Sequence, residues 1–154
     1  MIETPQIVET TARPTAIIHV VVQEEKIQEV MGPTLQELMG AIADQGVKPA
    51  GPWFTHHLRR PSDSFDFEVS VPVAAPVRRA GRVEPSEWPA MRVARTVYHG
   101  GYEGLAGAWS DFIDSIEANG HKPARDLWEV YSVGPETSSD PNDWRTQLNQ
   151  PLRD

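Results

Sequence analysis

The chain has 154 residues, of which 39% are hydrophobic and 23% charged, as is typical of one soluble globular domain. No apolar stretch approaches the roughly 20 residues of a membrane-spanning helix, and the N-terminus lacks the basic start and apolar run of a secretory signal. The absence of cysteine excludes disulfides and cysteine-ligated metal sites. The net charge of −8 argues against direct nucleic-acid binding. Together these features lead us to expect a cytoplasmic protein that binds neither nucleic acid nor membrane directly.

The predicted elements follow the same order in both halves of the chain, namely a strand, a helix and two further strands. In the first half the expected strands are residues 15–22, 53–58 and 65–73, the last alternating apolar and polar side chains. In the second half they are residues 91–98, 127–133 and, with a weaker signal, 144–149.

The two predicted helices are related by an internal repeat. The segment Gln-Gly-Val-Lys-Pro-Ala at 45–50 returns as Asn-Gly-His-Lys-Pro-Ala at 119–124, 74 residues later. The same offset superimposes two apolar stripes of helical spacing, Leu35, Leu38, Met39 and Ile42 on Trp109, Phe112, Ile113 and Ile116. Gly46 and Gly120 then stand where a helix ends in a left-handed residue.

This duplication predicts the α+β fold class. Each half of the chain would contribute one β-α-β-β unit, and the two units would form one antiparallel sheet, with both helices on one face and a ligand cleft on the other. We expect one domain over residues 1–154, with half-units of about 1–73 and 90–154 and a Pro- and Arg-rich linker at 74–89. Two separate domains are the alternative, although units this short bury little surface alone.

Glu129 is the main candidate for function. It lies between Trp128 and Tyr131 on a predicted strand, and a carboxylate among aromatic rings is costly to desolvate unless it is paired or protonated. We expect it to project away from the helices into the cleft, where it would attract a lipophilic cation or act as a general acid or base. The alternative is a strand glutamate that points to water.

The repeat adds Trp53 and His57 to the cleft, because the offset aligns them with Leu127 and Tyr131. Glu68 is a weaker candidate, since an ordinary solvated strand face explains it equally well. His56 and His57 are adjacent and would point to opposite faces of a strand, so we expect no metal site and no cofactor.

Tyr102 lies in a glycine-rich turn, His-Gly-Gly-Tyr-Glu-Gly at 99–104, just before the second predicted helix. Such a turn can bind an anion at a helix N-terminus, but the sequence matches no phosphate-binding loop and a flexible connection is the simpler interpretation. Tyr102 also continues the apolar stripe of Trp109, so it is either a core residue or a ligand contact.

The order of these motifs resembles the GyrI-like small-molecule-binding domains, which also serve as effector-binding modules of AraC- and MerR-type regulators. The motifs that carry the resemblance are His-Gly-Gly-Tyr at 99–102, Trp-Glu-Val-Tyr-Ser-Val-Gly-Pro at 128–135, and Asp-Phe-Glu-Val-Ser-Val-Pro-Val at 66–73. The resemblance implies a pseudo-two-fold fold whose cleft holds hydrophobic, often cationic compounds around a central glutamate, here Glu129. It further implies that Tyr131 and Tyr102, and less securely Trp53 and Glu68, line the cleft.

The resemblance favours a standalone binder of a hydrophobic, drug- or toxin-like molecule, because the motifs begin too near the N-terminus for a preceding DNA-reading domain. Some relatives are implied to hydrolyse electrophilic cyclopropane-containing toxins, so a hydrolase that uses Glu129 as acid or base is the second hypothesis. A third, a module that binds gyrase or another protein, follows from the family name alone.

Overall fold

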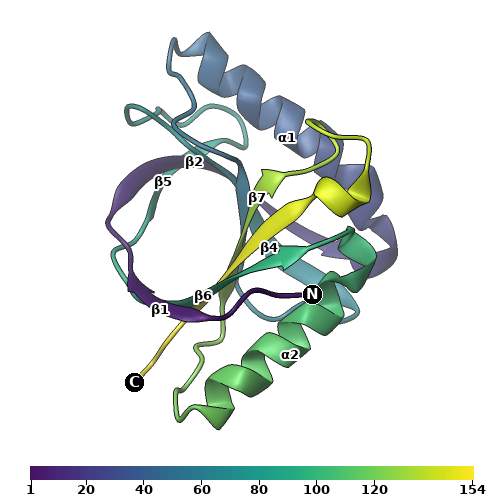
Figure 1. Cartoon of the computed structure of the whole chain (residues 1–154). Helices are drawn as coiled ribbons and strands as arrows, with labels where there is room; N and C mark the ends of the chain where they lie inside the picture. The colour runs from purple at the N-terminus through teal and green to yellow at the C-terminus, as the bar shows by residue number, and fades with distance from the viewer. The chain divides into compact units, whose positions relative to one another are not determined.

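The computed structural model describes residues 1–154 and contains two compact units, one formed by residues 1–10 with 91–154 and the other by residues 11–90 (Figure 1). Each unit combines antiparallel strands with one long helix, which confirms the predicted α+β class. That both units fold as a single domain stays a prediction. Neither helix has the combination of length and hydropathy that crossing a membrane requires.

The unit of residues 11–90 contains the first helix. Its elements are β2 (Arg13–Gln23), η1 (Glu24–Lys26), α1 (Ile27–Asp44), β3 (Phe54–His57), β4 (Ser64–Pro72) and β5 (Glu84–Trp88). The strands lie in the order β3-β4-β2-β5, with every neighbouring pair antiparallel. Alternate residues of β2 and β4, such as Ile18 and Phe67, form a core with Leu38 and Ile42 of α1.

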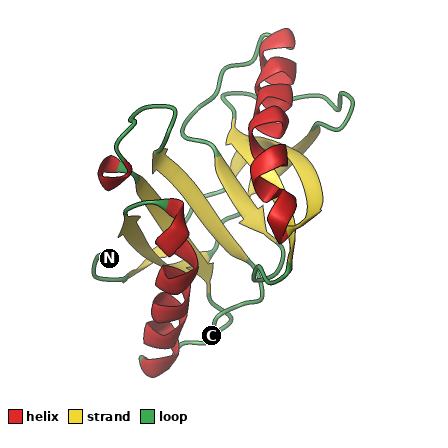
Figure 2. Cartoon of the chain, turned by 90° about the vertical axis from the view of Figure 1, so that its right-hand side faces the viewer, coloured by secondary structure: helices red, strands yellow, loops and turns green.

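The other unit repeats this arrangement. Its elements are β1 (Gln6–Glu9), β6 (Arg92–His99), η2 (Tyr102–Gly104), α2 (Leu105–Ala118), β7 (Leu127–Val133), η3 (Pro141–Asp143) and β8 (Arg145–Pro151). The strands lie in the order β1-β6-β8-β7, again antiparallel. The predicted stripe of α2, including Trp109 and Phe112, packs on Leu127 of β7 and Leu148 of β8. In Figure 2 each helix lies across the strands of its own unit.

The internal repeat extends to the hydrogen bonds that end the helices. Gly46 and Gly120 have φ values of 70° and 84°, so each takes the left-handed conformation expected of it. In both repeats the backbone amide that follows the glycine donates to a carbonyl in the last turn of the helix. Val47 donates to Ile42 and His121 donates to Ile116, each at 3.2 Å. This is the Schellman motif, and it occurs at matching positions of the repeat.

Two strands were not predicted, and both change the boundaries of the repeat. β5 lies inside the expected linker at 74–89 and pairs with β2 through the register Arg13↔Trp88. β1 pairs with β6 through Gln6↔Arg95, so the first residues of the chain join the second-half unit. Both strands are short edge strands with charged residues or proline, which weakens their sequence signal.

Candidate functional site

Glu129 is a buried carboxylate that accepts two hydrogen bonds within its own unit. Its side chain is on β7, and the residue is only 6% exposed. The Trp109 indole donates to one carboxylate oxygen (Nε1 to Oε2, 2.6 Å), and the Tyr131 hydroxyl donates to the other (Oη to Oε1, 2.7 Å). Hydrogen bonds of this kind, in which the acceptor is charged, favour the ionised carboxylate and offset part of its desolvation cost.

The structure corrects the direction in which Glu129 points. Strand alternation correctly groups it with Leu127 and Tyr131, but that face of β7 packs against α2, because Leu127 shares a core with Trp109. The Trp109 indole on α2 reaches Glu129 directly. The prediction that this side chain faces away from the helices is therefore wrong: alternation identifies which residues share a face, but not which face the helix covers.

Tyr102 and Tyr131 form an aromatic wall beside Glu129. Tyr102 comes from η2 and meets the ring of Tyr131 edge-on at a centroid distance of 6.0 Å. Its other neighbour is Trp144, 5.0 Å away and tilted by 38°. Burial, together with the nearby carboxylates of Glu136 and Glu129, raises the pKa of Tyr102 to about 12. The Tyr102 phenol is therefore neutral at physiological pH.

Three other predicted residues lie in the unit of residues 11–90. Trp53 is partly buried and packs against the core of that unit. His57 is 6% exposed, and its ring stacks on Phe67 at 5.2 Å, while its Nε2 and the Thr55 hydroxyl form a hydrogen bond of 3.0 Å. That these residues share a site with Glu129 stays a prediction.

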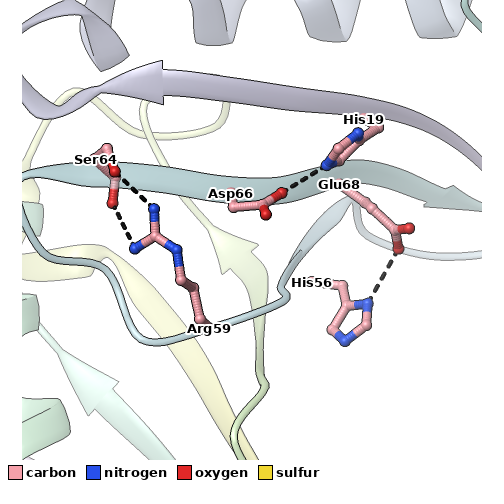
Figure 3. A network of polar contacts seen from close by, with 6 residues as sticks. All are labelled: His19, His56, Arg59, Ser64, Asp66 and Glu68. Atoms are coloured by element: carbon pink, nitrogen blue, oxygen red, sulfur yellow. Dashed lines mark hydrogen bonds and ion pairs between the residues drawn. The ribbon is translucent and has the colours of Figure 1, made fainter.

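Glu68 belongs to a polar face of β4 (Figure 3). His56 Nδ1 donates to its carboxylate at 3.0 Å, and His19 and Asp66 form a similar pair at 2.6 Å across β2 and β4. The register pairs His56 with Glu68 and His57 with Phe67, so the two histidines do point to opposite faces. The chain contains no group of three or more His, Asp or Glu side chains placed to hold a metal ion.

We call Glu129 and the residues around it the Glu129 cluster; its members are Glu129, Tyr131, Tyr102, Trp109, Trp144 and Glu136. Sequence patterns do not identify the last three as site residues. Helical spacing predicts that Trp109 lies in the apolar stripe, but spacing does not show where its indole N–H points. In the sequence, Trp144 is only the first residue of the expected strand with the weaker signal. In the structure, its indole donates to the carbonyl of Ser138 at 2.9 Å. No local pattern marks Glu136.

A separate hollow of about 290 Å³ lies in the same unit, between the N-terminus and α2. Its lining includes Ile2, Tyr98, Gly107 and Asp111, and none of the residues predicted to bind a ligand. The Glu129 cluster is the better candidate, because it combines a buried charge with aromatic rings.

Comparison with known proteins supports this view of the fold. The C-terminal domain of EcmrR superimposes with a TM-score of 0.86 at 19% identity, over 97% of each chain. The chain spans 57% of the length of EcmrR in its complex with DNA. A hydrolase from Listeria innocua gives a TM-score of 0.68 at 11% identity, over 96% of this chain and 91% of that chain.

SAV2435 bound to tetraphenylphosphonium also gives a TM-score of 0.68, at 10% identity, over 98% of this chain and 94% of that chain. At these identities the likeness shows the fold alone. No curated protein sequence matches the chain. The model of the GyrI-like small molecule binding domain, however, matches residues 3–153. The chain therefore belongs to the GyrI-like family of small-molecule-binding domains.

Proposed function

We propose that this protein binds a hydrophobic cation, with Glu129 as the counter-charge and Tyr102 and Tyr131 as the aromatic wall. The observation that carries the proposal is a carboxylate that is 6% exposed and held by the Trp109 indole and the Tyr131 hydroxyl. A carboxylate in such a place attracts positive charge strongly, since little water screens it.

The aromatic rings suit the same ligand class. The faces of Tyr102 and Tyr131 carry negative potential, so they attract a cation in addition to its apolar surface. The structural likeness to SAV2435 bound to tetraphenylphosphonium supports a compound of this kind. The net charge of −8 supports action without direct contact to nucleic acid.

A hydrolase of electrophilic cyclopropane-containing compounds is the second candidate, favoured by the Tyr131 hydroxyl on Glu129 at 2.7 Å and by the likeness to a Listeria innocua hydrolase. In such an enzyme Glu129 would move a proton to or from the substrate. Each of its oxygens accepts a hydrogen bond from the protein, and these bonds stabilise the ionised carboxylate and make proton uptake less favourable. Binding of a cation uses the ionised carboxylate directly and is therefore the preferred function.

Isothermal titration calorimetry with two ions of equal shape tests the proposal. The wild-type protein is expected to bind tetraphenylphosphonium and to exclude the tetraphenylborate anion. Glu129→Gln keeps the shape of the side chain and removes its charge, so the cation should lose about 1–3 kcal/mol of binding free energy. Equal affinity of wild type and variant for tetraphenylphosphonium would reject Glu129 as the counter-charge.

Product analysis by mass spectrometry tests the second candidate. The purified protein would be incubated with a cyclopropane-containing electrophile beside a Glu129→Ala control. Product formed by the wild-type protein but not by the Glu129→Ala variant would establish the hydrolase, whereas equal product in both samples would exclude it.

A further inference from the structure

The internal repeat makes two exposed carboxylates equivalent, Glu37 on α1 and Asp111 on α2, because they lie 74 residues apart. Glu37 forms a two-bond ion pair with Arg82, which donates from Nε to one carboxylate oxygen at 3.1 Å and from Nη2 to the other at 2.7 Å. These hydrogen bonds lower the pKa of Glu37 below its usual value. Asp111, in contrast, forms no ion pair and no side-chain hydrogen bond. One position of the repeat therefore carries a neutralised carboxylate in one unit and an unneutralised one in the other.

The difference arises from the segment that leads into the edge strand of each unit. Arg82 lies just before β5, and its guanidinium reaches α1. The segment before β1 instead brings Met1 and Ile2 beside α2, and neither side chain is charged. The N-terminal ammonium of Met1 forms no ion pair with Asp111 either. The chain thus places a guanidinium on Glu37 and no cation on Asp111.

The hollow of about 290 Å³ between the N-terminus and α2 has room for such a group beside Asp111. Asp111 lines it together with Gly104, Gly107 and Ile2. A Cβ atom at Gly107 would meet no atom within 4 Å, so this face of α2 is open. The side chain of arginine suits this combination, because its methylene stem packs on apolar surface while its guanidinium pairs with a carboxylate.

The rest of the exposed face of α2 favours a protein segment over a small molecule. α2 contains no basic residue, and the exposed carboxylates of Asp114 and Glu117 follow Asp111 at three-residue intervals. A helix rises about 1.5 Å per residue, so the three carboxylates span about 9 Å along the axis. A small cation in the hollow can pair only with Asp111, whereas a segment with several basic residues can pair with all three.

We propose that the hollow, together with Asp111, Asp114 and Glu117, is a docking surface for a basic segment of a partner protein, which inserts an arginine side chain beside Asp111. Further basic residues of that segment pair with Asp114 and Glu117. The docking surface shares no residue with the Glu129 cluster, so the inference does not depend on the proposed function.

Titrations followed by nuclear magnetic resonance test the docking surface. The probes are tetra-arginine and tetra-lysine peptides with blocked ends, and N-acetylarginine amide. Tetra-arginine should shift the amide signals of Gly104 and Gly107 in the hollow and leave those of Gly32 and Gly40 on α1 in place. It should bind at least about threefold more tightly than tetra-lysine, because a guanidinium donates two parallel hydrogen bonds to one carboxylate. N-acetylarginine amide should bind roughly tenfold more weakly than tetra-arginine, since it meets only one carboxylate.

Two variants should weaken tetra-arginine binding about three- to tenfold. Asp111→Asn removes the charge, and Gly107→Leu fills the hollow without changing any charge. Leucine is favoured over glycine inside a helix, and the open surroundings of Gly107 accommodate it, so this variant should fold. Glu37→Gln is the matched control, because it changes the net charge by the same amount at the equivalent position of the repeat, where Arg82 already neutralises the carboxylate. It should leave the affinity for tetra-arginine unchanged.

Absence of shifts at Gly104 and Gly107 overturns the docking surface, as does unchanged affinity for tetra-arginine in Gly107→Leu. An equal loss in Asp111→Asn and Glu37→Gln also overturns it, because net charge alone would then explain the binding. If N-acetylarginine amide binds as tightly as tetra-arginine, the ligand is a small guanidine and the partner protein is refuted. Asp111→Asn should keep the wild-type affinity for tetraphenylphosphonium, so this inference and the proposed function can fail separately.

Discussion

Replacing Trp109 by phenylalanine separates the hydrogen bond to Glu129 from the packing of the helix. Trp109→Phe keeps an aromatic ring beside Phe112, 5.8 Å away between centroids, but removes the N–H that lies 2.6 Å from Glu129 Oε2. A hydrogen bond to a charged acceptor contributes about 1.5–3 kcal/mol, and the smaller ring adds a packing loss of about 1 kcal/mol. We expect the free energy of unfolding to fall by about 3 kcal/mol.

A double-mutant cycle with Glu129→Gln isolates the polar part of that loss. The glutamine can still accept from the indole and can turn its amide toward Tyr131, but the charge is gone. The two substitutions should therefore be coupled by about 1 kcal/mol in urea unfolding followed by far-UV circular dichroism. Additivity within about 0.3 kcal/mol would refute the claim that Trp109 stabilises the charge of Glu129.

Three further predictions follow from other parts of the chain. The pKa of Tyr102 is raised to about 12, so its neutral form stabilises the fold below about pH 10 and this contribution is lost as the pH rises toward 12. Ultraviolet difference spectra of the wild-type protein and Tyr102→Phe should assign to Tyr102 an ionisation near pH 12, and ionisation of Tyr102 near pH 10 would contradict this. Gly120→Ala should lower the free energy of unfolding by about 1 kcal/mol, because φ is 84° there. Gly40→Ala, at an open helical position, should raise the free energy of unfolding by up to about 1 kcal/mol. Equal effects of the two substitutions would exclude the helix-end explanation. The amide of Lys122 and the ring of His121 lower the pKa of Asp154 to about 2. Asp154→Asn should therefore destabilise the protein at neutral pH and progressively less as the pH falls from about 4 to 2. A difference in unfolding free energy between wild type and variant that does not change with pH would contradict this.

Much of the fold could be predicted from the sequence because the repeat is visible in local chemistry. The stripe of α2 and the glycine at 120 each reflect short-range requirements, namely helical spacing and a left-handed residue, and the structure shows both. The edge strands β1 and β5 could not be predicted in this way. Their pairing with β6 and β2 depends on partners distant in the sequence, and neither segment alternates apolar and polar residues clearly.

The sequence indicated that Glu129 and Tyr131 share one face of a strand, but not which way that face points. Alternation grouped Glu129 with Tyr131, and the structure brings these two into contact. The helix partner Trp109 could not be found, since the same spacing serves a purely apolar core residue and one that also donates an N–H.

The central claim is that the Glu129 carboxylate is the counter-charge of a bound cation, and a crystal structure with tetraphenylphosphonium tests it most directly. We predict that the phosphonium lies beside Glu129 with phenyl rings against Tyr102 and Tyr131, within about 6 Å of their centroids. A cation seated instead in the hollow lined by Ile2 and Gly107, with Glu129 still bonded only within the protein, would contradict the account.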